Sequence, residues 1–226
     1  MKINDKETEL CNLLYKYHSD KCPRILHTYS PYYFELLKPI QRDVKNLLEI
    51  GVGNNSLMSP LVGAKYTAGA SLRAWRDFFP NACIFSIDIQ REVLFEEDRI
   101  KCFYADQSCL KSLRKFISLL KEDSKQPDLL FDIIIDDGSH VLNHARNSLI
   151  ALYPYLRTGG FYIIEDIKNT EIHLWLKCLP MYGRLIKVHI GNEPQDSFVV
   201  IQKVEMNEKL LQSVKRHVLQ ISSSFR

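Results

Sequence analysis

The chain has 226 residues, of which 46% are hydrophobic and 25% charged, and this size suits one large domain with a sizeable core. Its formal net charge is only +3, from 30 basic and 27 acidic residues, which argues against a nucleic acid or a membrane surface as partner. The six cysteines are dispersed without a CxxC pair, and neither a secretory signal nor a membrane-length apolar run is found, so we expect reduced thiols in the cytoplasm.

Apolar runs alternate with amphipathic segments along the chain, which predicts strands alternating with helices. This order is typical of a single α/β domain of the Rossmann-like type, a mostly parallel sheet with helices on both faces. We expect seven strands, with one antiparallel strand near the C-terminus because the last two are joined by a short turn. Residues 1–40 are expected to form a helical and loop cap that contributes to the site, and residues 41–226 the sheet domain. The expected strands are 44–53, 82–89, 101–108, 129–137, 161–167, 184–191 and 197–204, and the expected helices are 6–16, 32–40, 71–80, 109–123, 144–156, 171–180 and 207–221.

Every strand expected to be parallel ends in acidic residues. A single carboxylate at such a place is commonly a turn or cap residue, but five strands doing so together are hard to explain by turns alone. Ligands of open α/β sheets bind beyond the carboxyl ends of the strands, so these side chains are expected to share the rim of one site. The acids are Glu49, Asp88, Asp106, the pair Asp136 and Asp137, and the pair Glu165 and Asp166.

The segment LEIGVG, residues 48–53, predicts a tight glycine turn that a ligand can approach closely. The third glycine of a dinucleotide fingerprint is missing and no helix is expected directly after GVG, which argues against a nicotinamide enzyme. Asp88 ends the next strand, where an acid can accept hydrogen bonds from ribose hydroxyls. Asp106 and Gln107 could read an adenine edge, and the helix start at 69–71 could bind a carboxylate. Ribose, adenine and an amino-acid carboxylate together indicate S-adenosylmethionine.

With these features in place, the chain resembles the class I S-adenosylmethionine-dependent methyltransferases, and more narrowly the macrolide-sugar O-methyltransferases of the macrocin and mycinamicin type. The resemblance lies in ordered segments that span about two-thirds of the chain, and the sugar-modifying branch is indicated mainly by DDGSH and IIEDI. The segments are SDK (19–21) followed by His27 and Tyr29, LEIGVG (48–53), GASLRAWRDFFPNACIFSIDI (69–89), ADQS (105–108), DIIIDDGSH (132–140) and GGFYIIEDI (159–167).

The resemblance implies a set of residues that bind the cofactor. The SDK loop and the start of the 71–80 helix would close over the methionine end, and the glycine turn with the acids would hold the rest. Residues 54–68 depart from the family's usual stretch, so their contacts are not carried over. The implied cofactor-binding residues are Asp20, Lys21, Glu49, Gly51, Gly53, Ser71, Asp88, Asp106, Gln107 and Asp136.

Methyl transfer to a sugar hydroxyl requires activation of that hydroxyl, because it is a poor nucleophile at neutral pH. A neutral histidine can take the proton, and a divalent cation can lower the pKa of the hydroxyl. By resemblance, His140 would be the general base, with Asp137 also catalytic, and Asp137, Glu165 and Asp166 would bind Mg²⁺. Adjacent residues of an extended strand point to opposite faces, so Glu165 and Asp166 can reach one metal only where the strand has ended or twisted.

The sequence therefore predicts an O-methyltransferase acting on a hydroxyl of a sugar or another polyhydroxylated small molecule, with a glycoside as acceptor and a homo-oligomer as an open possibility. Three alternatives stay open at this point. One is a methyltransferase on RNA or a protein side chain, although no basic arm is found. Another is a non-catalytic S-adenosylmethionine-binding scaffold, which would have no use for a base. The third is a nicotinamide oxidoreductase.

Overall fold

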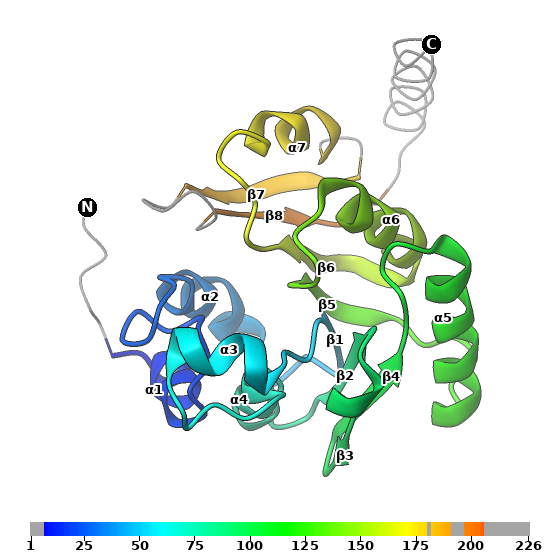
Figure 1. Cartoon of the computed structure of the whole chain (residues 1–226). Coiled ribbons are helices and arrows are strands. Elements are labelled where there is room, and N and C mark those ends of the chain that lie inside the picture. Colours follow the sequence, from blue (N-terminus) through cyan, green and yellow to red (C-terminus); the bar gives the residue numbers. More distant parts are fainter. Residues whose placement is uncertain (1–6, 180–181, 191–196, 206–226) are drawn as a thin grey trace.

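A computed structural model describes residues 7–179, 182–190 and 197–205, and shows one eight-stranded sheet in the order β3-β4-β2-β1-β5-β6-β8-β7 (Figure 1). The strands are β1 (Asn46–Ile50), β2 (Cys83–Asp88), β3 (Glu96–Glu97), β4 (Ile100–Tyr104), β5 (Phe131–Asp136), β6 (Leu156–Ile164), β7 (Arg184–His189) and β8 (Phe198–Gln202). The helices are α1 (Glu9–Lys16), α2 (Ser30–Leu37), α3 (Asn55–Val62), α4 (Ala70–Phe78), α5 (Leu110–Ser124), α6 (Leu142–Leu152) and α7 (Ile172–Cys178), with 3₁₀ turns η1 (Lys38–Ile40), η2 (Arg91–Val93) and η3 (Tyr153–Tyr155).

Five strands that are neighbours in the sheet, in the order β4-β2-β1-β5-β6, are parallel, as the sequence predicts. The strand β8 runs antiparallel to both β6 and β7, which confirms the reversed strand near the C-terminus. The predicted count of seven strands is wrong by one, because the short β3 adds an antiparallel edge to β4. Two residues are too few to leave a periodic pattern in the sequence.

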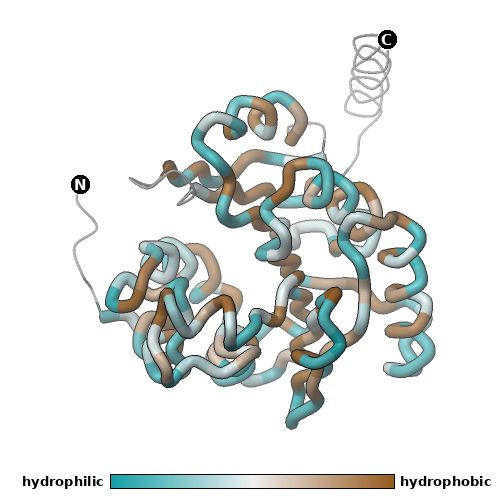
Figure 2. Tube along the Cα trace, viewed as in Figure 1, coloured by the Kyte–Doolittle hydropathy of each residue, from teal (hydrophilic) through white to brown (hydrophobic). Residues whose placement is uncertain are grey.

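Both faces of the sheet are apolar, because neighbouring residues of a strand point to opposite sides. On β1, Leu47 packs in the core under α1, α2 and α4, whereas Leu48 packs in the core under α5, α6 and α7. Figure 2 shows the apolar residues running along the central strands, with polar residues on the outer faces of the helices. The central strands are therefore buried from both sides, and only their ends remain available for a site.

The segment after the glycine turn is helical. The expected absence of a helix after the glycine turn is wrong, since α3 begins at Asn55, and the Asn54 side chain accepts a hydrogen bond from the Ser56 backbone N–H. Pro60 lies inside this helix, which ends two residues later. The helix expected at 207–221 lies outside the described residues. Within the described ranges, no helix has the length and apolar character needed to cross a membrane.

Candidate active site at the carboxyl edge of the sheet

A cavity of about 730 Å³ lies where the parallel strands end. Ten of the predicted site residues line it, so the structure brings the rim together as the sequence indicates. Four others are not among the lining residues and lie buried beneath them. Those that line the cavity are Asp20, Gly51, Gly53, Ser71, Asp88, Asp106, Gln107, Asp137, His140 and Asp166, and the four beneath it are Lys21, Glu49, Asp136 and Glu165.

The glycine turn after β1 lets the backbone pass close to its neighbours. Gly51 and Gly53 have positive φ angles of 100° and 81°, which glycine adopts without strain. A Cβ on Gly51 would overlap the backbone oxygen of Asp137, and a Cβ on Gly53 would overlap the hydroxyl of Tyr66. The turn therefore packs closely against Asp137 and Tyr66, and a side chain at either glycine would force these neighbours to move.

The acids at the ends of β2 and β4 stabilise the rim by hydrogen bonds to its backbone, and both also line the cavity. The Asp88 carboxylate accepts hydrogen bonds from the backbone N–H groups of Val52 and Gln90, each at 2.9 Å, and so ties β2 to the glycine turn. Asp106 accepts from the backbone N–H of Ser108 at 2.8 Å and from its hydroxyl at 2.6 Å. Each carboxylate oxygen can accept more than one hydrogen bond, so both acids can still receive hydroxyl or amino donors of a ligand.

Gln107 connects the buried acid of β5 to the loop above it. Its amide nitrogen donates to Asp136 Oδ1 at 2.6 Å, and its amide oxygen accepts from the backbone N–H of Ser139 at 2.9 Å. Burial raises the pKa of Asp136 to about 6, although the Gln107 hydrogen bond opposes this. The Ser139 hydroxyl in turn lies 2.9 Å from His144 Nδ1. Ser139 and His144 also line the cavity, and sequence reasoning missed both as site residues although DDGSHVLNH contains them.

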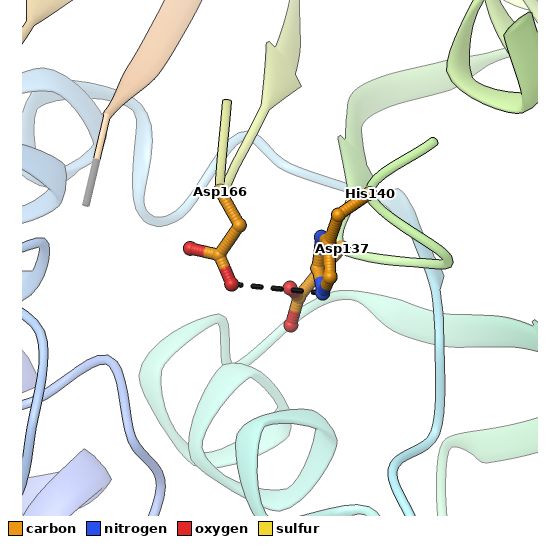
Figure 3. A group of neighbouring side chains, drawn as sticks. All are labelled: Asp137, His140 and Asp166. Atoms are coloured by element: carbon orange, nitrogen blue, oxygen red, sulfur yellow. Dashed lines mark ion pairs between the residues drawn. The ribbon is translucent and has the colours of Figure 1, made fainter. Parts of the chain in front are cut away.

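Three side chains from the ends of β5 and β6 converge on one point of the cavity (Figure 3). Asp137, His140 and Asp166 each offer one potential metal-ligand atom, and these three atoms all lie within 4.8 Å of one another. His140 Nε2 is 3.6 Å from Asp166 Oδ2. Burial raises the pKa of Asp166, and the negative charge of Asp137 raises it further. The group has the donor set of a divalent cation site.

Backbone geometry explains how Asp166 reaches this group. The strand β6 ends at Ile164, and Asp166 has a left-handed φ of 50°, so the two acids of IIEDI no longer alternate across an extended strand. His140 also has a left-handed φ, of 55°. Such conformations are uncommon for residues other than glycine and concentrate at functional sites.

Glu165 takes a different position from Asp166. It is buried, its Oε2 lies 2.5 Å from Lys21 Nζ, and its Oε1 accepts a hydrogen bond from the Tyr33 hydroxyl. Burial raises its pKa well above the ordinary range, although Lys21 opposes this. Of the three predicted metal ligands, the structure thus groups Asp137 and Asp166 with His140 and directs Glu165 to Lys21. That Glu165 is a metal ligand stays a prediction.

Glu49 lies in the same buried layer. Ser71 Oγ donates to its Oε1 at 2.8 Å and Trp75 Nε1 donates to its Oε2 at 2.5 Å. Lys21 Nζ is 3.6 Å from Oε1. Burial raises the pKa of Glu49 to about 7 in spite of Lys21. Through these two hydrogen bonds, Glu49 holds the first half of α4 in place beneath the cavity.

The segment between α1 and the end of α2 supplies further contacts to the acids, and their hydroxyl donors were not predicted. The Tyr29 hydroxyl donates to Asp166 Oδ1 at 2.5 Å, and Tyr33 donates to Glu165. His27 stacks on Tyr29, with ring centroids 4.9 Å apart, and its Nε2 lies 3.9 Å from Asp166 Oδ1. The sequence shows an aromatic loop here, but nothing in its spacing indicates which acid each ring would reach.

The residues present fit both groups that the sequence implies. The cavity has the volume of a small-molecule site, and Gly51 and Gly53 of the glycine turn line it. Asp137 and Asp166 offer the hard oxygen ligands that suit Mg²⁺. A divalent cation between them would also remove the repulsion that raises the pKa of Asp166.

Comparison with known proteins identifies relatives, although no family model matches the chain. It is 32% identical to the mycinamicin VI 2''-O-methyltransferase of Micromonospora griseorubida over 180 residues, which are 79% of this chain and 39% of that protein. It is 35% identical to the demethylmacrocin O-methyltransferase of Streptomyces fradiae over 161 residues, which are 70% of this chain and 34% of that protein. The chain therefore spans only between a third and two fifths of the length of these curated relatives.

Among solved structures, the chain is similar to the MycE methyltransferase from the mycinamycin biosynthetic pathway in complex with Mg, SAH and mycinamycin VI. The TM-score is 0.67 at 26% identity, and the match covers 90% of this chain and 56% of that one. The chain thus has the fold of the class I S-adenosylmethionine-dependent methyltransferases and is related in sequence to the macrolide-sugar O-methyltransferases of the macrocin and mycinamicin type.

Proposed function

We propose that the chain transfers a methyl group from S-adenosylmethionine to a hydroxyl of a sugar or another polyhydroxylated small molecule, with a glycoside as acceptor and Mg²⁺ as second cofactor. The observation that carries this proposal is the group of Asp137, His140 and Asp166 on the wall of the cavity. It is supported by relatives that are named for O-methylation of glycosylated natural products and by a structural neighbour in complex with Mg and SAH.

The cofactor would lie along the glycine turn, which lines the cavity. Asp88 and Asp106 would accept hydrogen bonds from its ribose and adenine, while Asp20 and Ser71 would contact its methionine end. Glu49, Asp136 and Lys21 would act from beneath, because they are buried and fix the residues that touch the ligand. Gln107 would mainly hold the loop in place, since both ends of its amide already have partners in the protein.

His140 would take the proton of the acceptor hydroxyl. Its ring lines the cavity, and Asp166 lies close enough to stabilise the imidazolium that forms. Asp137 and Asp166 would hold the metal, which when bound lowers the pKa of a coordinated hydroxyl. The contact of Tyr29 with Asp166 fixes that carboxylate from the opposite side.

The test separates the cofactor, the metal and the base. Calorimetry would measure binding of S-adenosylhomocysteine and of Mg²⁺ to the wild type, Asp137→Asn and His140→Ala, with His173→Ala on the exposed face of α7 as control. We expect all four to bind S-adenosylhomocysteine and only Asp137→Asn to lose Mg²⁺. Methyl transfer to a panel of glycosides should fall about 100- to 10,000-fold in His140→Ala.

Each negative outcome has its own meaning. If S-adenosylhomocysteine does not bind the wild type, the cofactor assignment is wrong and a scaffold function has to be considered. Cofactor binding without any response to Mg²⁺ would leave a methyltransferase but remove the metal. Transfer to RNA or protein in place of glycosides would refute the acceptor class. Sedimentation of the same samples tests whether the chain forms a homo-oligomer.

A further inference from the structure

Tyr66 lies between the glycine turn and the start of α4, in the segment whose contacts the resemblance leaves open. The residue is only 6% exposed, and its ring belongs to a small apolar cluster with Val62 of α3 and Ala70 of α4. Its hydroxyl lies against Gly53, where a Cβ would overlap it. Tyr66 and Gly53 both line the cavity. The hydroxyl is therefore held beside the glycine turn, at the wall of the cavity.

Hydrogen bonds fix the chain between Tyr66 and α4. The Ala68 backbone N–H donates to Asn55 Oδ1 at 2.9 Å, which ties this segment to the start of α3. The Gly69 N–H donates to the carbonyl of Val52, in the glycine turn, at 2.8 Å. Because the backbone is anchored and the ring is buried, the fold determines where the Tyr66 hydroxyl lies.

The Tyr66 hydroxyl has no hydrogen-bond partner among residues 7–179, 182–190 and 197–205. Buried polar groups are nearly always paired, so a hydroxyl at a cavity wall without a partner in the protein indicates one in the cavity. Burial raises the pKa of this hydroxyl above its ordinary range, and the negative charge of Asp20 raises it further. The phenol therefore keeps its proton and can donate it in a hydrogen bond.

The start of α4 adds donors beside this hydroxyl. Ser71 was expected to contact the methionine end of the cofactor, but its hydroxyl donates to Glu49 Oε1 at 2.8 Å, so that hydrogen is already used. The backbone N–H groups of Ala70 and Ser71 lie in the first turn of α4 and have no acceptor in the described parts of the chain. Both residues line the cavity, as Tyr66 does. Two N–H groups at a helix N-terminus together with a phenol hydroxyl suit a carboxylate.

We infer that the Tyr66 hydroxyl binds the carboxylate of the methionine end of S-adenosylmethionine, together with the first N–H groups of α4. Asp20 also lines the cavity and supplies the opposite charge for the ammonium group of the same end. Tyr66 is then a cofactor-binding residue that replaces the hydroxyl of Ser71, which Glu49 occupies. The inference rests on the proposed function, because the carboxylate belongs to the proposed cofactor.

The experiment measures the binding of two ligands to three proteins by calorimetry. S-adenosylhomocysteine carries the carboxylate, whereas its decarboxylated analogue keeps the nucleoside, the sulfur and the ammonium group. Tyr66→Phe removes only the hydroxyl. Tyr17→Phe is the matched control, because Tyr17 packs against the same cluster but is not among the residues that line the cavity, and its hydroxyl donates to Asp77 at 2.6 Å.

We expect the wild type to bind S-adenosylhomocysteine more tightly than the decarboxylated analogue. Tyr66→Phe should bind S-adenosylhomocysteine about 10- to 100-fold more weakly, as is typical for the loss of a hydrogen bond to a charged group, and should bind the analogue as the wild type does. Tyr17→Phe should keep both affinities. Thermal unfolding without ligand should show the reverse pattern, because Tyr17→Phe loses its bond to Asp77 whereas the Tyr66 hydroxyl has no such bond to lose. A tyrosine with a purely structural role would instead lower the melting temperature and weaken both ligands alike.

The outcomes separate this inference from the proposed function. If the wild type binds neither ligand, the proposed cofactor is refuted, and the role of Tyr66 with it. If the wild type binds both ligands equally well, the carboxylate is not recognised, so the inference is overturned while the cofactor stands. The same holds if Tyr66→Phe weakens both ligands by the same factor or keeps the full affinity for S-adenosylhomocysteine. A loss confined to the ligand with the carboxylate supports the inference.

Discussion

Replacing Glu49 by Gln should make the chain more stable at pH 8 than at pH 5, relative to the wild type. Glu49 is fully buried, and its pKa is raised by burial from 4.5 to about 7. Between these two values the folded state keeps a proton that the unfolded state has lost, so this group's contribution to stability falls as the pH rises and is constant above pH 7. The pKa of Glu49 differs by about 2.5 (7 − 4.5) between the folded and the unfolded state. At about 1.4 kcal/mol per pKa unit, this difference changes the free energy of unfolding by roughly 3 kcal/mol. A glutamine side chain at this position cannot titrate, and its amide still offers a partner to Ser71 and Trp75.

The assay is urea unfolding followed by circular dichroism at several pH values from 4.5 to 8, without added metal. The free energy of unfolding of Glu49→Gln minus that of the wild type should rise by about 3 kcal/mol over this range, a shift of roughly 1 M in the urea midpoint. A constant offset from the altered contact with Lys21 does not affect this slope. Glu122→Gln, on the exposed side of α5, should show no slope. A difference that does not change with pH would refute the argument that Glu49 is protonated by burial.

Two further predictions concern the glycine turn and the contacts from α2. Gly63→Ala should cost about 1–3 kcal/mol because of its positive φ angle, and Gly51→Ala should cost more, because its Cβ would also overlap the backbone oxygen of Asp137. Only Gly51→Ala should also lose at least tenfold in affinity for S-adenosylhomocysteine, because a Cβ has open space at Gly63 but overlaps the backbone at Gly51. Calorimetry measures both affinities, and equal values would contradict this prediction. Tyr33→Phe should lower the free energy of unfolding by about 1–3 kcal/mol, because it removes a hydrogen bond to the buried Glu165. Thermal unfolding against Tyr15→Phe, an exposed tyrosine, checks this, and equal melting temperatures would show that the hydrogen bond contributes nothing.

The sheet could be predicted because its signals are local. Apart from Glu49 and Asp132, the runs at 47–50 and 131–135 are apolar and buried on both faces, as central parallel strands require, and acids at their carboxyl ends meet at one edge. The position of Asp137, His140 and Asp166 follows from that edge. The helix α3 was not predicted, because Pro60 is normally a helix breaker and the segment is short.

The connections between distant segments could not be predicted. The sequence places Lys21 in a polar loop and Glu165 at a strand end, and nothing in either segment specifies that they touch. Nothing in the sequence indicates that the hydroxyls of Tyr29 and Tyr33 donate to Asp166 and Glu165. Such pairs depend on how the segment from α1 to α2 packs on the sheet, which is a property of the whole fold.

The ion pairs of Lys21 have a consequence for the order in which the chain folds. Its contacts with Asp137 and Glu165 close loops of 116 and 144 residues, and that of Tyr29 with Asp166 closes one of 137. Contacts over such separations form slowly, because the entropy of loop closure is lost before they are made. During synthesis from the N-terminus, Lys21 cannot contact Glu165 until β6 has been made and has joined the sheet. The candidate site is therefore expected to be completed among the last events of folding, and a chain that stops before residue 165 would have the sheet's first strands but no completed site.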